Sequence, residues 1–405
     1  MLFIEANTTG TGMLALEKTQ HLGLHPIFLT NKPERYLGLE RFSESVVVCD
    51  TNSSGAIQTV INQQLDLPAL RGITTTSEFY IETVAELSTL YGLPGNHPTA
   101  IRACRNKART RALLAEAGVY QPRFAVLDSL DDLPTHSAAI GLPCVVKPAD
   151  DTGSNEVRLC LSLDEIKAQA QRIWRMHTNV RGQRTAATVL LEEYLDAPEY
   201  SVETFFWEGG CIHIGITEKS VAGTPFFVEH RHIFPAPLPA ATMAHINETV
   251  ERALRAAGIT FGPMHTEVKL TPHGCAIIEI NARLAGGMIP ELIRHATGID
   301  LLEQQLRSVA GQPPRLEAQP TSYAGIQFLL PPRAGTLVAV HGIERAERSP
   351  GVEQVVLNAR IGSSVALAQS AYQRLGFIIA RGSSAAETAD HLRQAHEQLA
   401  VEVTP

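Results

Sequence analysis

The most informative stretch of this sequence is MHTEVKLTPHGCAIIEINAR, residues 264–283. Two runs of alternating apolar and polar residues flank Pro272-His273-Gly274, and this pattern predicts a β-hairpin. The spacing fits a three-residue loop with Gly274 in the left-handed position. Such a loop pairs Thr271 with Cys275 and so determines the register of both strands.

The predicted register brings two acidic side chains together. Glu267 falls directly opposite Glu279, and Asn281 falls opposite His265 on the same face, because side chains repeat every two residues. Facing carboxylates repel by about 0.2–1 kcal/mol, but a divalent cation turns the repulsion into ligation. A solvated face with acids by chance is the alternative, although three isoleucines in the second strand indicate a buried hairpin. Glu267, Glu279 and Asn281 are therefore candidate ligands of Mg²⁺, with Mn²⁺ as a substitute.

A second informative stretch is LPCVVKPADDTGSNEVRL, residues 142–159. Lys147 ends an apolar strand and is followed by Pro148 and a polar loop, 150–155, that contains one glycine and Ser154. Such a loop can close over phosphates while the lysine ammonium pairs with their charge. A surface hairpin with a solvated lysine is the competing interpretation of this stretch taken alone.

The stretch TVLLEEYLDAPEYSVETFF, residues 188–206, predicts two strands joined by a short acidic connector. Main-chain groups at such a strand end can bind the edge of an adenine. A carboxylate such as Glu199 can accept hydrogen bonds from both ribose hydroxyls. An acidic surface turn explains Asp196 but not four acids at this spacing.

Charged and aromatic residues also gather in residues 216–239, which include Lys219, Glu229, His230 and His232. Their position in the sequence, between the strands of 188–206 and the acidic hairpin of 264–283, makes them candidates for substrate binding. Alternation along a strand would place both histidines on one face, where they could equally be structural hydrogen-bonding groups.

Two glycine motifs complete the candidates. Gly10-x-Gly12-x-x-Ala15 follows an apolar strand and outlines a dinucleotide-binding βαβ unit. The second strand ends in Thr30-Asn31-Lys32 without the acid that binds a ribose, so we expect these glycines to serve close helix packing, and an oxidoreductase is disfavoured. Gly286-Gly287 precedes a helix, where either an anionic group or a simple helix-entry turn fits.

Composition excludes several classes of partner. The net charge is −8 and no long Lys/Arg run is present, so neither nucleic acid nor an anionic membrane is expected. The six cysteines are scattered without a C-x-x-C pair, which indicates free thiols in a reducing compartment. The start of the chain carries no signal-peptide pattern, and no apolar run could span a bilayer. We expect a cytoplasmic protein.

The chain of 405 residues is long enough for two to three domains. Alternating strand and helix patterns over 1–98 predict a small parallel sheet with helices on both faces. Residues 99–312 predict an α+β domain, with a smaller lobe at about 120–193. A linker near 311–322 leads to a third unit, 313–405, made of strands and one long helix.

The order of these motifs along nearly the whole chain resembles the ATP-grasp superfamily. The shared order is Arg105-Asn106-Lys107, V-V-K-P, the glycine-bearing loop, L-E-E-Y-L-D-A-P-E-Y-S-V-E and finally E…E-I-N-A-R. The resemblance implies an α/β and α+β ATP-grasp fold. Its parts would be an N-terminal Rossmann-like domain, a two-lobed ATP-clamping domain and a C-terminal α+β piece that closes the site.

The resemblance also implies a role for individual residues. The implied ATP-binding set is Lys107 and Lys147 at the α- and β-phosphates, Ser154 in the loop over the γ-phosphate, Glu192, Glu193 and Leu195 at the adenine, Glu199 at the ribose, and Glu267, Glu279 and Asn281 at Mg²⁺. The implied catalytic set is Arg283, which would steady an acyl phosphate, with Lys147 and His232. The implied substrate-binding set is Lys219, Glu229, His230, His232, Arg283, Gly286 and Gly287.

Within the superfamily, EHRHIFPAPL together with EANTTGTG is similar to L-amino-acid ligases that form dipeptides. The implied activity is an ATP-dependent carboxylate–amine ligase that joins two amino acids through an acyl phosphate and releases ADP and phosphate. A homodimer is expected. The alternatives are a biotin-carboxylase-like enzyme, a formate- or carbamoyl-using ligase of the purine type, and a non-enzymatic nucleotide-binding regulatory protein.

Overall fold

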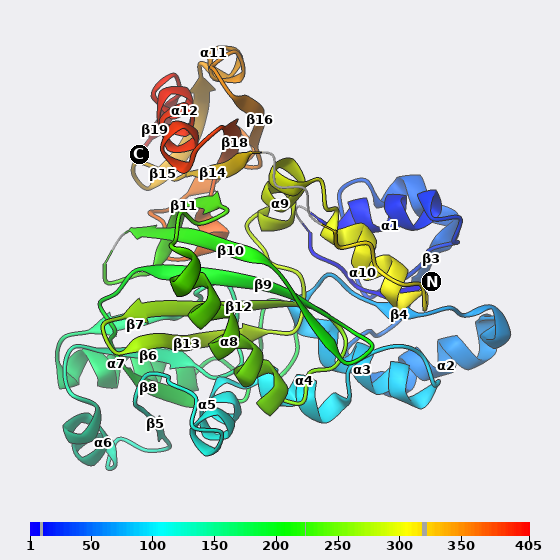
Figure 1. Cartoon of the computed structure of the whole chain (residues 1–405), viewed down its shortest axis with the longest axis horizontal. Helices are drawn as coiled ribbons and strands as arrows, with labels where there is room; N and C mark the ends of the chain where they lie inside the picture. Colours follow the sequence, from blue (N-terminus) through cyan, green and yellow to red (C-terminus); the bar gives the residue numbers. More distant parts are fainter. Residues whose placement is uncertain (9–10, 223, 318–321) are drawn as a thin grey trace.

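A computed structural model describes residues 1–8, 11–222, 224–317 and 322–405 (Figure 1). The N-terminal unit is a parallel sheet of order β3-β2-β1-β4, as the strand–helix alternation predicted. Its elements are β1 (Leu2–Ile4), α1 (Thr11–His21), β2 (Ile27–Thr30), β3 (Val46–Val48), α2 (Ser54–Gln64), β4 (Ile73–Thr74) and α3 (Ile81–Leu90). Helix α1 packs on one face of the sheet, and α2 and α3 pack on the other.

Gly12 explains the glycine-rich start of α1. A Cβ at Gly12 would lie 1.9 Å from the carbonyl oxygen of Asn7, so only glycine lets the helix begin this close to the loop after β1. The close-packing role expected for Gly12 is therefore confirmed. Gly10 lies outside the described residues.

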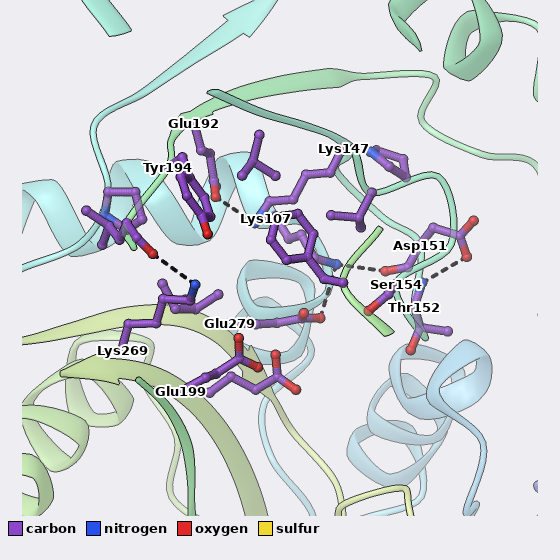
Figure 2. Close-up of a pocket in the computed structure, with 18 of the residues that line it drawn as sticks. Lys107, Lys147, Asp151, Thr152, Ser154, Glu192, Tyr194, Glu199, Lys269 and Glu279 are labelled. Atoms are coloured by element: carbon purple, nitrogen blue, oxygen red, sulfur yellow. Dashed lines mark hydrogen bonds and ion pairs between the residues drawn. The ribbon is translucent and has the colours of Figure 1, made fainter. Parts of the chain in front are cut away.

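The small lobe is an antiparallel sheet of order β5-β8-β6-β7 with two helices. Its elements are β5 (Phe124–Leu127), α6 (Leu133–Ile140), β6 (Cys144–Pro148), β7 (Arg158–Cys160), α7 (Leu163–Trp174) and β8 (Val189–Glu193). Ile166, Ala170 and Ile173 of α7 pack with the apolar side chains of β6 and β8 in one core cluster. This packing holds Lys147 and Glu192 at the side of the lobe that faces the rest of the molecule (Figure 2).

The largest sheet has eight strands in the order β13-β12-β9-β10-β11-β14-β18-β16. The large-lobe elements are β9 (Glu199–Trp207), β10 (Gly210–Ala222), β11 (Val228–Phe234), α8 (Ala240–Ala256), β12 (Gly262–Thr271), β13 (Gly274–Asn281), α9 (Ile289–Thr297) and α10 (Leu301–Val309). The C-terminal elements are β14 (Tyr323–Leu329), β15 (Gly335–His341), α11 (Ile343–Glu347), β16 (Val352–Leu357), β17 (Ser364–Val365), β18 (Gly376–Gly382), α12 (Ala385–Glu397) and β19 (Ala400–Thr404). Because β14 pairs with β11, the expected division at residue 312 separates segments of sequence rather than sheets.

The chain between the N-terminal unit and the small lobe forms α4 (Pro98–Arg105) and α5 (Lys107–Glu116), which are separated at Asn106 because its side chain caps α5. Helices α9 and α10 are likewise separated at Gly298. One local prediction was wrong: the hairpin loop contains two residues rather than three, since Thr271 pairs with Gly274. None of the helices in the described part of the chain combines the length and apolar character needed to span a bilayer.

Candidate active site

The acidic pair forms as predicted, although the hairpin loop does not. Thr271 pairs with Gly274, and a register shift between Glu267 and Val268 leaves Ile278 without a partner in the β12–β13 ladder. This β-bulge restores the expected pairing of Glu267 with Glu279 and of His265 with Asn281. One error in the predicted loop was thus cancelled by one extra residue in β13.

A cleft of about 820 Å³, a volume that includes space open to solvent, lies between the small lobe and the large sheet. Figure 2 shows the lysines, the loop after β6 and the acids of the large sheet facing one another across it. Ten of the predicted residues line the cleft: Lys107, Lys147, Ser154, Glu192, Glu193, Leu195, Glu199, Glu229, Glu267 and Glu279. Among the described residues, seven predicted ones do not line it: Lys219, His230, His232, Asn281, Arg283, Gly286 and Gly287.

Lys147 is held from behind by a buried ion-pair network. Its Nζ lies 2.7 Å from Glu192 Oε2, and Arg111 Nε lies 2.7 Å from Glu192 Oε1. Arg111 also donates to the carbonyls of Ile277 and Ile278, which the bulge leaves accessible. Burial would raise the pKa of Glu192, but Arg111 and Lys147 lower it to about 2. Glu192 is therefore ionised, and its carboxylate positions Lys147.

Lys107 is placed by the break between α4 and α5. As the first residue of α5, its N–H donates to the carbonyl of Ala149, and its Nζ donates to the carbonyl of Asp151 at 2.7 Å. The same Nζ lies 3.1 Å from Glu279 Oε1 (Figure 2). Lys107 thus joins the loop after β6 to the acidic hairpin. Lys107 and Lys147 thus both line the part of the cleft that a polyphosphate would contact.

Lys219, which the sequence suggested as a substrate-binding residue, holds three acids together. Its Nζ lies 3.1 Å from Glu199 Oε1, 2.5 Å from Glu229 Oε1 and 2.6 Å from Glu267 Oε1, and 1% of its side chain is exposed. Burial would lower the pKa of Lys219, but the carboxylates raise it well above its usual range. Lys219 was predicted to bind substrate; in this structure its ammonium contacts Glu199, Glu229 and Glu267 instead.

Replacing Lys219 with methionine is expected to lower the free energy of unfolding by roughly 3 kcal/mol, because three partly buried carboxylates would lose their shared, buried cation. Urea unfolding of both proteins measures the difference. The control is Lys167→Met, which breaks a half-exposed ion pair with Asp164 and should change stability by less than about 1 kcal/mol. Equal stability of Lys219→Met and wild type would contradict the assigned role.

His265 lies below the acidic pair and is buried. Its Nδ1 lies 2.8 Å from Glu203 Oε1, and its Nε2 lies 3.4 Å from Glu267 Oε1. Burial would lower the pKa of His265, but Glu203 and Glu267 outweigh it and raise the pKa to about 9. An imidazolium therefore supports Glu267 from the interior of the sheet at neutral pH.

This pKa predicts a pH-dependent contribution to stability. Because the folded-state pKa exceeds the unfolded value of about 6.5, the stabilisation is complete below about pH 6.5 and is lost as the pH rises through about 9. The stability advantage of wild type over His265→Gln should shrink by about 3 kcal/mol across that range. Urea unfolding at several pH values measures this. An advantage that stays constant with pH would rule the contribution out.

A second group of side chains surrounds Glu229 at the junction with the C-terminal strands. Arg374 Nη2 lies 2.9 Å from Glu229 Oε2, and His232 Nε2 lies 3.5 Å from the same oxygen. A Cβ at Gly287 would lie 3.2 Å from His232 Nε2, so Gly287 adjoins this histidine, whereas a Cβ at Gly286 would meet no atom within 4 Å. Burial lowers the pKa of His232 below its usual value.

The two histidines do not share a face by simple alternation. Lys219 pairs with His232 and Val221 pairs with Glu229, and a register shift between Ser220 and Val221 leaves His230 outside the ladder. The bulge therefore brings Glu229 and His232, three residues apart, onto the side of Lys219. The expectation that simple alternation places His230 and His232 on one face was wrong.

Arg283 lies beside the cleft rather than in its lining. Its guanidinium donates to Glu78 and to the carbonyl of Leu284, and it lines a second cavity of about 550 Å³. Arg105 Nη1 lies 3.0 Å from the other oxygen of Glu78. Burial would raise the pKa of Glu78, but Arg283 and Arg105 lower it to about 2. The charge of Glu279 also raises the pKa of Arg283, so the arginine stands within electrostatic reach of the acidic pair.

The connector after β8 provides an apolar and aromatic end of the cleft. Lys269 Nζ donates to the carbonyl of Leu195 at 2.9 Å and lies 5.3 Å from the ring centre of Tyr194, with Phe227 beside it. The carboxylate of Glu193 turns the other way and binds Arg123. Because side chains alternate along β8, those of Glu192 and Glu193 point in opposite directions. The prediction that both residues line the adenine did not consider this alternation.

Several residues that organise this site were not predicted from the sequence: Glu78, Arg111, Tyr194, Lys269 and Arg374. Arg111 carried a usable signal, since it lies four residues after Lys107 and so on the same helix face. Arg374 carried none, because its contact with Glu229 spans 145 residues of sequence.

Comparisons with known proteins agree with this geometry. Residues 140–291 match the ATP-grasp domain model, and residues 327–404 match that of the L-amino acid ligase C-terminal domain 2. An uncharacterized protein, y4rH of Sinorhizobium fredii (strain NBRC 101917 / NGR234), is 31% identical over 404 residues, covering 100% of this chain and 83% of that protein. The L-arginine-specific L-amino acid ligase of Bacillus subtilis is 24% identical over 329 residues, covering 80% of this chain and 78% of the ligase.

Solved structures give the same result for the fold. The L-amino acid ligase from Bacillus licheniformis superposes with a TM-score of 0.83 at 24% identity, covering 100% of this chain and 98% of that one. The fold class is thus ATP-grasp, as the order of motifs indicated. Together with the C-terminal domain match, the sequence relatives show that the chain belongs to the L-amino acid ligase family of that superfamily.

Proposed function

We propose that the chain joins the carboxylate of one amino acid to the amine of a second at the expense of ATP. The observation that carries the proposal is the cleft, in which Lys107 and Lys147 face the opposed acids Glu267 and Glu279 (Figure 2). Two lysines on one side and a carboxylate pair on the other suit a polyphosphate with a divalent cation between them. The L-amino acid ligase C-terminal domain favours this activity over carboxylation of biotin.

The donor set fits a magnesium ion with ATP. Glu267 and Glu279 offer carboxylate oxygens on the cleft face of one hairpin, and hard oxygen donors are those that Mg²⁺ prefers; Mn²⁺ accepts the same donors. Asn281 is buried opposite His265 and would have to contribute its amide oxygen from the end of β13. Bound there, the ion would neutralise charge on phosphate oxygens.

We assign the remaining roles along the cleft. Lys107 and Lys147 would bind phosphate oxygens, and Ser154 in the loop after β6 would cover the terminal phosphate. The connector at Leu195, with Tyr194 and Phe227, would enclose the adenine, and Glu199 would accept from the ribose. The loop is itself closed from the C-terminal side, because Ala371 N donates to the carbonyl of Gly153.

In the first step, a carboxylate oxygen of one amino acid attacks the γ-phosphorus, the bond to the β–γ bridging oxygen breaks, and ADP leaves. In the second step, the amine nitrogen of the other amino acid attacks the acyl carbon, phosphate leaves and the nitrogen loses a proton. Arg283 would stabilise the charge on the acyl phosphate. His232, whose lowered pKa keeps it neutral near pH 7, would accept the proton beside Glu229.

The test is a phosphate-release screen of the purified protein against pairs of amino acids, with mass spectrometry of the products. A productive pair should give equal amounts of ADP, phosphate and one dipeptide, with little turnover from either amino acid alone. Turnover driven instead by bicarbonate and biotin, or by formate, would overturn the proposal. Nucleotide binding without turnover would indicate a regulatory protein.

We also propose a homodimer in the cytoplasm. All six cysteines are free, which suits a reducing compartment. Light scattering of the purified protein would determine the number of chains, and cell fractionation would determine the compartment.

A further inference from the structure

A cluster of metal-ligating side chains lies in the large lobe away from the cleft. Cys211 and His213 of β10 and Glu251 of α8 each offer one ligand atom, and these three atoms lie within 4.8 Å of one another. No other group of three or more such side chains meets this distance within residues 1–8, 11–222, 224–317 and 322–405. The proposed ligase reaction does not use this cluster.

A second irregularity of β10 creates the cluster. Lys219 and Glu199 pair on the cleft side of the sheet, and unbroken alternation would put Cys211 and His213 on that side too. The register shifts between His213 and Gly215, so the alternation reverses. Cys211 therefore packs with the apolar cluster that includes side chains of α8, on the opposite face of the sheet.

The side chains are arranged as ligands would be. His213 Nε2 lies 3.2 Å from Glu251 Oε2, while Arg255 holds the other oxygen of Glu251 at 2.7 Å. The Nδ1 atom of His213 is shielded from solvent and has no hydrogen-bond partner among the described residues. An outer guanidinium that fixes a carboxylate leaves one oxygen directed at the centre, as in many metal sites.

We propose that Cys211, His213 and Glu251 bind one zinc-type divalent cation, with water as the fourth ligand, and so tie α8 to β10. Thiolate, imidazole and carboxylate together select a borderline cation over Mg²⁺, which prefers oxygen ligands throughout. The cation would also stabilise the thiolate that burial disfavours. Burial raises the pKa of Cys211 to about 12, so binding would release its proton.

The experiment uses Co²⁺ and Zn²⁺ with the full-length protein, stripped with a chelator and kept in excess Mg²⁺ so that Glu267 and Glu279 are occupied. Wild type should bind one equivalent of Co²⁺ with a thiolate charge-transfer band, which Zn²⁺ abolishes by displacement. Zn²⁺ should also raise the thermal unfolding temperature. The control Cys49→Ser, which changes a half-buried cysteine of the N-terminal unit, should behave as wild type.

Three variants test the ligands. Cys211→Ser should lose the charge-transfer band, and His213→Gln and Glu251→Gln should each weaken Zn²⁺ affinity at least about 10-fold. Far-UV circular dichroism identifies any variant that fails to fold. If Cys211→Ser does not fold, the Zn²⁺ affinities of His213→Gln and Glu251→Gln test the site. The proposal is overturned if wild type binds no stoichiometric Co²⁺ in excess Mg²⁺, or if the band persists in Cys211→Ser.

Discussion

Replacing Glu279 with glutamine is expected to lower ligase turnover at moderate Mg²⁺ roughly 10³-fold, because the transition state loses several kcal/mol of stabilisation by the metal. The substitution keeps the shape of the side chain but removes the charge that faces Glu267 and pairs with Lys107. The measurement is amino-acid-dependent ADP release at several Mg²⁺ concentrations. Part of the rate should return at high Mg²⁺, since Glu267 remains as a ligand.

The control for this experiment is Glu353→Gln, which changes an acid of β16 that forms an exposed ion pair with Arg381. Its turnover should equal that of wild type at every Mg²⁺ concentration. A normal rate for Glu279→Gln at moderate Mg²⁺ would remove the acidic pair from the mechanism. If Glu279→Gln folds and its loss of turnover is the same at every Mg²⁺ concentration, the role of Glu279 is to hold Lys107 rather than to bind a metal.

Replacing Arg283 with methionine is expected to lower kcat by roughly 10²–10³-fold, the usual effect of removing one charged donor from a transition state. Arg283 lies outside the lining of the nucleotide cleft, so the dissociation constant for ATP should change little. Glu78 retains Arg105 as a partner, which limits the structural damage. Steady-state ADP release and equilibrium nucleotide binding separate the two effects.

The control here is Arg102→Met, which removes an arginine of α4 that is bound to Glu82 and Glu86 near the surface. It should retain wild-type kcat. Undiminished ADP release by Arg283→Met would remove Arg283 from the catalytic set. A large loss of ATP affinity without a loss of kcat would instead place the arginine at the nucleotide.

The acidic hairpin shows how far prediction from the sequence reached. The facing of Glu267 and Glu279 was predicted correctly, but from a three-residue loop that the structure replaces with two residues and a bulge at Ile278. A bulge depends on a contact that is remote in sequence, here Arg111 binding the carbonyls of Ile277 and Ile278. Strand periodicity could therefore predict that Glu267 faces Glu279, but not the bulge at Ile278 that produces this pairing.

Lys219 shows where prediction from the sequence stopped. Its charge and its place between two motifs suggested a substrate contact, whereas its Nζ is shared by acids from β9, β11 and β12. These strands are neighbours only because the sheet has the order β12-β9-β10-β11, in which sequence order is not preserved. The same holds for Arg374, which precedes β18 and reaches Glu229 because β14 pairs with both β11 and β18.

Spacing within a few residues was enough to predict the succession of units, the acidic pair, the lysine-bearing strand and the glycine-bearing loop. Which charges are partners, and which remain available to ligands, depends on how the strands assemble in three dimensions. This assembly joined Lys219 to three acids, turned Glu193 away from Glu192 and aimed Arg283 at Glu78. The physical reason is that side-chain periodicity is local, whereas the pairing of buried charges depends on strand order and bulges set by contacts across the whole fold.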